Sequence, residues 1–247
     1  MDTRPQPRLR LICLPHAGGG ASGYREWSPY LPDDVAVLPV RLPGREDRFL
    51  EPAIDSMDLL VDRLLGELSR YLDRPFAFFG HSMGALLAFE MAKRLYPRGI
   101  EPVHLFASGC RAPHLPGRRS MDRHVLPDRE FVAAVQALNG IPAEIAENQD
   151  LMDLVLPTLR SDFRLVETYL HHPQRPLCCS VSAIGGLQDN EVLREDLAAW
   201  SCHTTGRFKV HMLPGDHFFV TSSRTSLLRL VVRELGRWTR PGSNSCT

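Results

Sequence analysis

The sequence predicts an α/β fold in which a mostly parallel β-sheet is flanked by helices and carries a helical insertion. Two patterns along the 247 residues support this prediction. Short apolar runs alternate with amphipathic helical stretches, and parallel strands need such crossover helices between them. The alternation stops only at about residues 114–176, where helical patterns follow one another directly. Hydrophobic residues make up 43% of the chain, which is enough to bury a sheet on both faces.

Five of the six predicted strands are short apolar runs, the pattern expected of strands buried on both faces, and the sixth, Arg207–Leu213, alternates between apolar and polar residues. The six predicted strands are Leu9–Leu14, Val35–Val40, Phe76–Phe79, Val103–Ala107, Cys178–Ile184 and Arg207–Leu213. Four of the connecting stretches show apolar residues at helical spacing. These predicted helices are Met57–Leu72, Ala85–Leu95, Leu193–Trp200 and Ser226–Trp238. In such a sheet, the loops that carry function lie at the carboxyl ends of the strands.

The segment from residue 114 to residue 176 shows no strand pattern. Its predicted helices are Asp128–Leu138, Gln149–Arg160 and Ser161–Leu170. An all-helical insertion between two strands of a sheet is most simply a lid over the functional edge. We therefore expect a single domain, residues 1–247, with this lid inserted in it.

Composition and charge exclude several classes of protein. Lys and Arg number 29 and Asp and Glu number 29, so the formal net charge is zero, which argues against a nucleic-acid binder. No apolar run approaches the roughly 20 residues that a membrane helix needs, and the first residues lack a signal-peptide pattern. We expect a cytoplasmic monomer that binds neither nucleic acid nor membrane.

The chain has six cysteines, and their spacing fits neither a disulfide framework nor a zinc site. We therefore expect reduced thiols and no metal. Cys13 and Cys178 lie in apolar runs and are predicted to be core residues.

The segment Gly80-His81-Ser82-Met83-Gly84 lies between a predicted strand and a predicted helix. This is the setting of the Gly-x-Ser-x-Gly motif of α/β-hydrolases, in which the serine sits on a sharp strand-to-helix turn. Glycines at both ends allow strand and helix to approach closely, and a single occurrence in the right context argues against a chance match. We expect Ser82 to be a nucleophile, with His81 shaping the turn.

A serine nucleophile needs a base and an acid, and in this fold they follow the serine in the order acid, then histidine. His217 comes directly after the last predicted strand and is the expected base. Asp189 follows the preceding strand and is the expected acid, with Asp196 as a second choice. Asp216 is disfavoured because the side chains of neighbouring residues diverge.

Two backbone N–H groups are needed to stabilise an oxyanion. One comes from the residue after the nucleophile, which is Met83, and the other from a Gly-rich loop after an early strand. The segment Pro15-His16-Ala17-Gly18-Gly19-Gly20 follows the first strand, and Ala17 is the expected donor. The alternative of a phosphate-binding loop is weak, because the segment has no Walker lysine.

Together, these segments resemble the type II thioesterases of polyketide and nonribosomal peptide pathways. The matching segments are LPHAGGGASGYREW, VLPVRLPGREDR, FAFFGHSMGA, LPTLRSDFRLVETY, IGGLQDNEV and MLPGDHFFV. The resemblance implies hydrolysis of acyl groups from the phosphopantetheine arm of acyl or peptidyl carrier proteins, without a cofactor. It also implies the same five roles, with Ser82, Asp189 and His217 as the triad and Ala17 and Met83 as oxyanion donors.

Two further groups of residues are candidates for substrate and partner contacts. Apolar residues in the insertion could line an acyl pocket or could equally pack the lid on the body: Met152, Leu156, Leu159 and Phe163. Four arginines could dock an acidic carrier protein, although a solvated loop is slightly favoured: Arg111, Arg118, Arg119 and Arg123.

Two rival functions remain open from the sequence. A carboxylester hydrolase or an acyltransferase could use the same triad. A non-catalytic binding protein with a relic site is disfavoured, because a complete triad and an oxyanion loop are both predicted.

Overall fold

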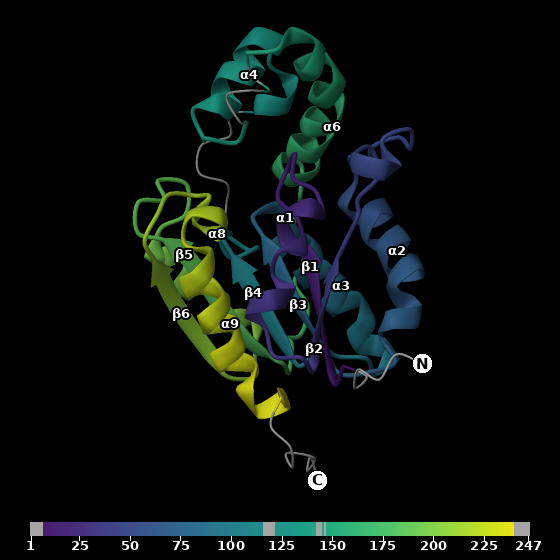
Figure 1. Cartoon of the computed structure of the whole chain (residues 1–247), viewed down its shortest axis with the longest axis vertical. Coiled ribbons are helices and arrows are strands. Elements are labelled where there is room, and N and C mark those ends of the chain that lie inside the picture. The colour runs from purple at the N-terminus through teal and green to yellow at the C-terminus, as the bar shows by residue number, and fades with distance from the viewer. Residues whose placement is uncertain (1–6, 116–121, 142–144, 146, 240–247) are drawn as a thin grey trace.

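The computed structural model describes residues 7–115, 122–141, 145 and 147–239. Its centre is a six-stranded sheet in the order β2-β1-β3-β4-β5-β6, in which every neighbouring pair is parallel (Figure 1). The strands are β1 (Leu9–Leu14), β2 (Val35–Pro39), β3 (Phe76–His81), β4 (His104–Ser108), β5 (Ser180–Gly186) and β6 (Phe208–Leu213). All six predicted strands are present, with ends that differ by two residues or fewer.

One cysteine prediction is wrong because of such a difference. Strand β5 begins at Ser180, so Cys178 lies before the sheet and is exposed, and Cys179 is buried in its place. Cys13 lies inside β1 and is fully buried, as predicted. Burial raises the pKa of the Cys13 thiol well above its ordinary value.

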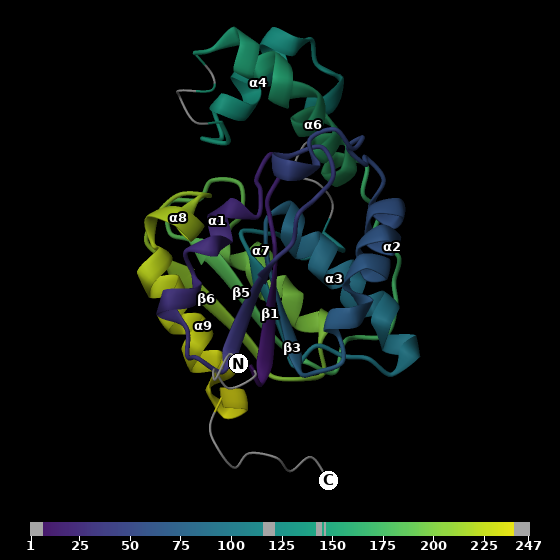
Figure 2. The ribbon, with the colours of Figure 1, turned by 45° about the vertical axis from the view of Figure 1, so that its right-hand side comes forward.

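Helices cover both faces of the sheet (Figures 1 and 2). On one face, apolar side chains of α2 (Met57–Leu68), α3 (Met83–Leu95) and α7 (Arg194–Ala198) pack against the strands. On the other face, α1 (Ser22–Arg25), α8 (Phe219–Ser222) and α9 (Arg224–Thr239) form a second apolar cluster. Strand β1 alternates between the two clusters, since Leu11 and Cys13 enter one and Ile12 and Leu14 enter the other. Burial on both faces explains the nearly continuous apolar runs.

Short 3₁₀ turns join or extend several elements. They are η1 (Ser28–Tyr30), η2 (Glu46–Arg48), η3 (Ser69–Tyr71), η4 (Tyr96–Arg98), η5 (Arg123–Val125) and η6 (Ala199–His203). The predicted helices Met57–Leu72 and Leu193–Trp200 are each an α-helix that ends in such a turn.

Part of the segment between β4 and β5 lies beyond the carboxyl ends of the strands (Figure 1). It contains η5, α4 (Asp128–Gln136) and α6 (Gln149–Glu167). The prediction of separate helices at Gln149–Arg160 and Ser161–Leu170 is wrong, because α6 continues through both. Its buried face repeats at helical spacing through Leu159, Asp162 and Leu165, so burial favours one uninterrupted helix. Among the described residues, no helix is both long and apolar enough to span a membrane.

Candidate active site

Ser82 occupies the turn between β3 and α3. Its backbone has φ +53° and ψ −116°, a left-handed conformation that is rare for residues other than glycine and is typical of functional sites. The flanking glycines are required by close packing. A Cβ atom at Gly80 would lie 2.1 Å from the carbonyl oxygen of Gly84, and one at Gly84 would lie 2.2 Å from that of Leu14. The local sequence therefore fixes the serine on a sharp turn, as predicted from the motif.

His217 and Asp189 meet at the carboxyl ends of β6 and β5. The Nδ1 atom of His217 lies 2.8 Å from Oδ2 of Asp189, whose side chain is fully buried. The other carboxylate oxygen of Asp189 accepts hydrogen bonds from the backbone N–H groups of Glu191 and Val192, at 2.8 and 3.1 Å. The aspartate is thus held by its own loop, and His217 lines the same cavity as Ser82.

The two alternative carboxylates face other partners. Asp196 accepts the N–H of Leu193 at 2.9 Å and forms an ion pair with Arg111 at 3.2 Å. Asp216 accepts hydrogen bonds from Asn139 Nδ2 and from the N–H of Phe218, both at 2.9 Å. Among the described carboxylates, the geometry therefore favours Asp189 as the partner of His217.

Ala17 and Met83 line the cavity next to Ser82. Met83 is the first residue of α3, so its N–H is one of the helix N-terminal donors without an acceptor inside the helix. In the part of the chain that the structure describes, the N–H groups of Ala17 and Met83 donate no hydrogen bond. Both N–H groups therefore remain free to bind an acceptor in the cavity.

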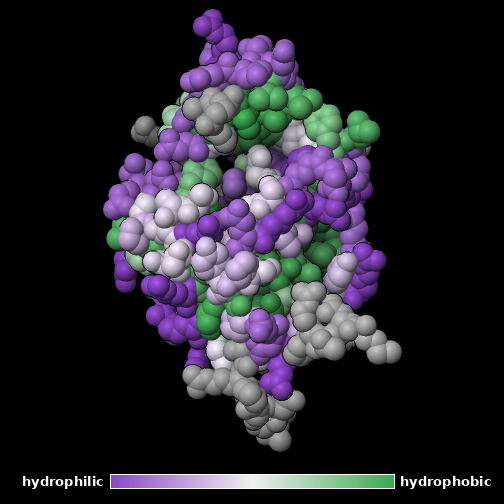
Figure 3. Space-filling model, in the orientation of Figure 1, coloured by the Kyte–Doolittle hydropathy of each residue, from purple (hydrophilic) through white to green (hydrophobic). Residues whose placement is uncertain are grey.

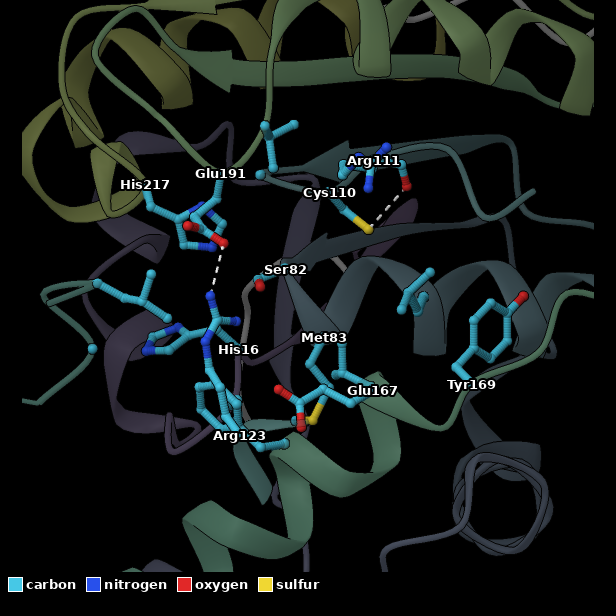
Figure 4. Close-up of a pocket in the computed structure, with 18 of the residues that line it drawn as sticks. His16, Ser82, Met83, Cys110, Arg111, Arg123, Glu167, Tyr169, Glu191 and His217 are labelled. Carbon is cyan, nitrogen blue, oxygen red and sulfur yellow. Dashed lines mark hydrogen bonds and ion pairs between the residues drawn. The ribbon is translucent and has the colours of Figure 1, made fainter. Parts of the chain in front are cut away.

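The cavity has a volume of about 350 Å³ and lies between the sheet and the lid. The space-filling view is hollowed between these two parts (Figure 3). In the close-up, Ser82 lies between His217 and Met83 (Figure 4). Apolar side chains from α3 and from the lid line much of the rest: Leu86, Leu115, Val135, Phe163 and Val166.

The four predicted pocket residues are divided between two places. Phe163 lines the cavity. Met152 and Leu159 are buried in the core of the lid, and Leu156 packs against that core. None of these last three is among the described residues that line the cavity. These three residues pack within the lid itself, a place that differs from both alternatives, the acyl pocket and the contact of lid with body.

The four predicted docking arginines are also divided. Arg111 and Arg123 line the cavity. Arg111 forms an ion pair with Asp196, and Arg123 reaches Glu191 at 3.4 Å, the contact marked in Figure 4. Arg118 and Arg119 lie outside the described residues.

Two histidines at the site were given no catalytic role from the sequence, although both lie in quoted motifs. His81 is fully buried, and its Nδ1 lies 3.0 Å from Ser108 Oγ. Burial, followed by the charges of His217 and His16, lowers its pKa well below the ordinary value. His16 lines the cavity, and burial lowers its pKa to about 4. Both rings are neutral at pH 7, and of the three histidines that surround Ser82, namely His16, His81 and His217, it is His217 that contacts a carboxylate.

A second histidine cluster lies apart from the cavity. Ligand atoms of His114, Cys202 and His203 lie within 4.8 Å of one another, and they join the segment after β4 to two neighbouring residues of η6. His114 Nδ1 is 2.7 Å from His203 Nε2, so a direct hydrogen bond accounts for the approach of the rings. None of the three is among the described residues that line the cavity.

This chain is similar in sequence and in structure to known thioesterases. The family model for a thioesterase domain matches residues 9–235. The relative named linear gramicidin dehydrogenase LgrE, from Brevibacillus parabrevis, is 45% identical over 92% of this chain and 87% of its own length. The solved RedJ thioesterase from the prodiginine pathway of Streptomyces coelicolor is 41% identical, with a TM-score of 0.86 over 93% of this chain and 86% of that one. The type II thioesterase BorB from the borrelidin biosynthetic cluster is 36% identical, with a TM-score of 0.85 over 94% and 96% of the two chains.

Proposed function

This chain belongs to the thioesterase family, and from that membership we propose that Ser82, His217 and Asp189 hydrolyse acyl thioesters on the phosphopantetheine arm of a carrier protein. The contact that carries the proposal is the 2.8 Å hydrogen bond between His217 and the buried Asp189, beside a serine on a left-handed turn. This combination provides a base with a fixed orientation and a half-buried nucleophile that lines the same cavity. Editing or release in polyketide and nonribosomal peptide biosynthesis is the corresponding role, and the RedJ and BorB relatives belong to a prodiginine biosynthetic pathway and a borrelidin biosynthetic cluster.

In the first half of the reaction, Ser82 Oγ attacks the thioester carbonyl carbon while His217 Nε2 accepts the hydroxyl proton. Asp189 holds the Nδ1–H tautomer and stabilises the imidazolium. The N–H groups of Ala17 and Met83 bind the oxyanion, a contribution of about 10²–10³ in rate for each donor. The C–S bond then breaks, and His217 returns the proton to the departing sulfur. An ester on Ser82 remains.

In the second half, water attacks that ester and His217 again takes a proton. The same two N–H groups stabilise the second oxyanion. The C–O bond to Ser82 breaks, the proton returns to Ser82 Oγ, and the acid is released. The residues named supply all of the proton transfers.

The cavity is suited to many different acyl groups. Its apolar lining includes Leu86 and Phe163. An apolar pocket distinguishes substrates by only about 1–3 kcal/mol per methylene. An enzyme that removes many different acyl groups needs no sharper selection than this.

A carrier protein is the proposed partner, with Arg111 and Arg123 at the cavity as its first contacts. Both are paired with carboxylates, so acidic groups of a carrier would compete with Glu191 for Arg123. Reversing the charge in Arg123→Glu is expected to raise KM for an acyl-carrier protein about fivefold and to leave KM for an acyl-pantetheine unchanged, in the range of an interface charge contact. Equal KM values for variant and wild type on both substrates would exclude docking at Arg123.

The dehydrogenase in the name of the gramicidin relative suggests a different activity. Gly18, Gly20 and Gly23 have the Gly-x-Gly-x-x-Gly spacing, but only the four-residue helix α1 follows them. The carboxylates of Asp162 and Glu46 accept the N–H groups of Gly18, Ala21 and Ser22, which a dinucleotide phosphate would need. Ser82, His217 and Asp189 instead suit acyl transfer to a serine. A carboxylester hydrolase is the closer rival, because the triad is equally suited to oxygen esters.

The deciding experiment is mass spectrometry of an acylated carrier protein incubated with the enzyme. Wild type should return the free phosphopantetheine thiol, and Ser82→Ala should leave the acyl group in place. Oxygen esters and acyl-coenzyme A are assayed in parallel. Faster turnover of oxygen esters would favour the carboxylester hydrolase, and failure of a fluorophosphonate probe to label Ser82 would argue for a non-catalytic protein.

We also propose a cytoplasmic monomer. Burial raises the pKa of the Cys13 and Cys179 thiols, to about 12 for Cys179. Both therefore stay protonated and unreactive, as expected of thiols that remain reduced in the cytoplasm. Sedimentation of the purified chain and fractionation of its host cells test these two points.

A further inference from the structure

We propose that Asp162, on lid helix α6, is a positioning residue that holds the oxyanion loop, defined here as residues 16–22, so that the Ala17 N–H faces the substrate. This inference rests on the proposed function. It gives the lid a part in catalysis, because Asp162 lies on the lid and the oxyanion loop lies on the body of the protein.

The first contact lies one residue from the proposed donor. The N–H of Gly18 donates a hydrogen bond to Asp162 Oδ2 at 2.7 Å. Gly18 has φ +74°, so the chain turns sharply there, and Gly19 N–H closes the turn onto His16 carbonyl oxygen at 2.9 Å. The carboxylate therefore fixes the peptide that follows Ala17.

Asp162 is itself held by Arg45. The Nη1 and Nη2 atoms of Arg45 lie 2.7 Å from the two carboxylate oxygens, a bidentate ion pair. Arg45 Nη1 also donates to the carbonyl oxygen of Gly19 at 3.1 Å. Asp162 is 1% exposed and Arg45 9%. Water competes little for such a buried pair, so the geometry of the carboxylate is well defined.

A second carboxylate holds the far end of the oxyanion loop. The two oxygens of Glu46 accept the N–H groups of Ala21 and Ser22, at 3.0 and 2.8 Å. Asp162 and Glu46 thus occupy three N–H groups of the loop, and His16 carbonyl oxygen occupies that of Gly19. Within the described residues, the N–H groups of His16, Ala17 and Gly20 donate no hydrogen bond, and of these three residues His16 and Ala17 line the cavity. The two carboxylates therefore fix the backbone on the C-terminal side of Ala17 and leave its N–H available to the substrate.

Helix α6 also contacts the oxyanion loop and the loop that follows β2. A Cβ atom at Gly18 would lie 2.8 Å from Leu159 Cδ1, and Thr158 Oγ1 donates to the carbonyl oxygen of Gly44 at 2.8 Å. Figure 2 shows the end of α6 beside the loops that follow β1 and β2. Movement of this helix away from the body would therefore remove an acceptor from Gly18 and loosen the oxyanion loop.

A purely structural ion pair would make a different prediction. It would change stability and leave the chemistry of folded molecules unaltered. A positioning role affects the transition state, which carries the oxyanion, more than it affects the bound substrate. Affinity for an inhibitor that forms a tetrahedral adduct with Ser82 separates the two roles.

The experiment compares wild type with Asp162→Asn on an acyl-carrier substrate and on a trifluoromethyl ketone analogue of an acyl-pantetheine. The asparagine keeps the shape and loses the charge that attracts Arg45 and Gly18. We expect kcat to fall at least tenfold, the Ki of the ketone to rise by a similar factor, and KM to stay within about twofold, since one misplaced oxyanion donor costs up to about 10²–10³. Amide exchange over residues 16–22 should also become faster in the variant.

Asp128→Asn is the matched control. It removes a lid carboxylate that pairs with Arg160, but its side chain is 73% exposed and it contacts no residue of the oxyanion loop among the described contacts. Its kcat and Ki should equal those of wild type.

A folded Asp162→Asn with kcat and Ki within twofold of wild type would overturn the positioning role. If this variant does not fold, as judged by circular dichroism, Arg45→Lys is measured in the same way, because it keeps the charge and breaks the bidentate contact. A folded Arg45→Lys with unchanged kcat and Ki would then overturn it. Absence of thioesterase activity in wild type would instead reject the proposed function.

Discussion

His217 Nδ1 lies 2.8 Å from Oδ2 of Asp189, although 28 residues separate them in the chain. Parallel pairing of β5 with β6 produces this contact, since the loops after both strands emerge at one edge of the sheet. Asp189 is fully buried and its second oxygen is occupied by two backbone N–H groups. The carboxylate can therefore serve only one side chain, and that side chain is His217.

The first prediction concerns this contact. Asp189→Asn should lower kcat by about 10⁴, because the amide does not hold the histidine in the tautomer that accepts the serine proton, as in other serine hydrolases. KM should change little, and kcat is measured on an acyl-pantetheine. Asp216→Asn is the control, because Asp216 adjoins His217 but bonds Asn139 and Phe218. Equal losses in the two variants would contradict the assignment of Asp189.

The second prediction concerns the packing at the nucleophile turn. A methyl group at Gly84 would lie 2.2 Å from a backbone oxygen, so Gly84→Ala should lower the free energy of unfolding by more than about 3 kcal/mol or prevent folding. Gly66→Ala is the matched control. Gly66 lies on the exposed face of α2, where a methyl group meets nothing within 4 Å. This substitution should raise that free energy by about 0.5–1 kcal/mol. Urea unfolding measures both values, and a Gly84→Ala variant as stable as wild type would mean that strand and helix are less close.

The third prediction concerns stability against acid. Burial lowers the pKa of His16 from about 6.5 to about 4, so the unfolded chain binds a proton that the folded chain does not. The stabilisation is complete above pH 6.5 and is lost as the pH falls toward 4. It amounts to up to about 3 kcal/mol. Burial lowers the pKa of His81 as well, so its contribution has the same sign.

Urea unfolding at several pH values between 7 and 4 measures this dependence. His16→Asn should flatten the fall in the free energy of unfolding over that range, because one of the two buried rings is removed. A slope equal to that of wild type would show that His16 does not contribute to the acid sensitivity.

The fourth prediction separates two residues of α6 that the sequence placed in one group. Phe163 lines the cavity, whereas Met152 is 4% exposed and belongs to the core of the lid. Phe163→Ala should shift the ratio of kcat/KM for branched over linear acyl groups about tenfold, within the range available to an apolar pocket. Met152→Ala should leave that ratio unchanged and lower the free energy of unfolding by about 2–5 kcal/mol. A ratio that shifts equally in both variants would contradict this separation.

Much of the fold could be predicted because burial on both sheet faces leaves a strong local signal. Each strand is an apolar run, and each crossover helix has one apolar face. The ends of the helices and strands could be predicted less well. Whether β5 begins at Cys178 or at Ser180 depends on pairing with β4, and whether α6 breaks at Ser161 depends on which face the lid buries.

The sequence by itself determined the strand-to-helix turn at Ser82, because the glycines at both ends are local requirements of the backbone. It also determined the order in which the predicted acid and base follow that serine. Only the tertiary structure decided that Phe163, and not Met152, lines the cavity, and that Asp162 and Arg45 meet at Gly18. Residues 45 and 162 lie 117 positions apart, and no periodicity links them. Their contact depends on how the lid helix packs against the loops of the body, which is set by the whole chain.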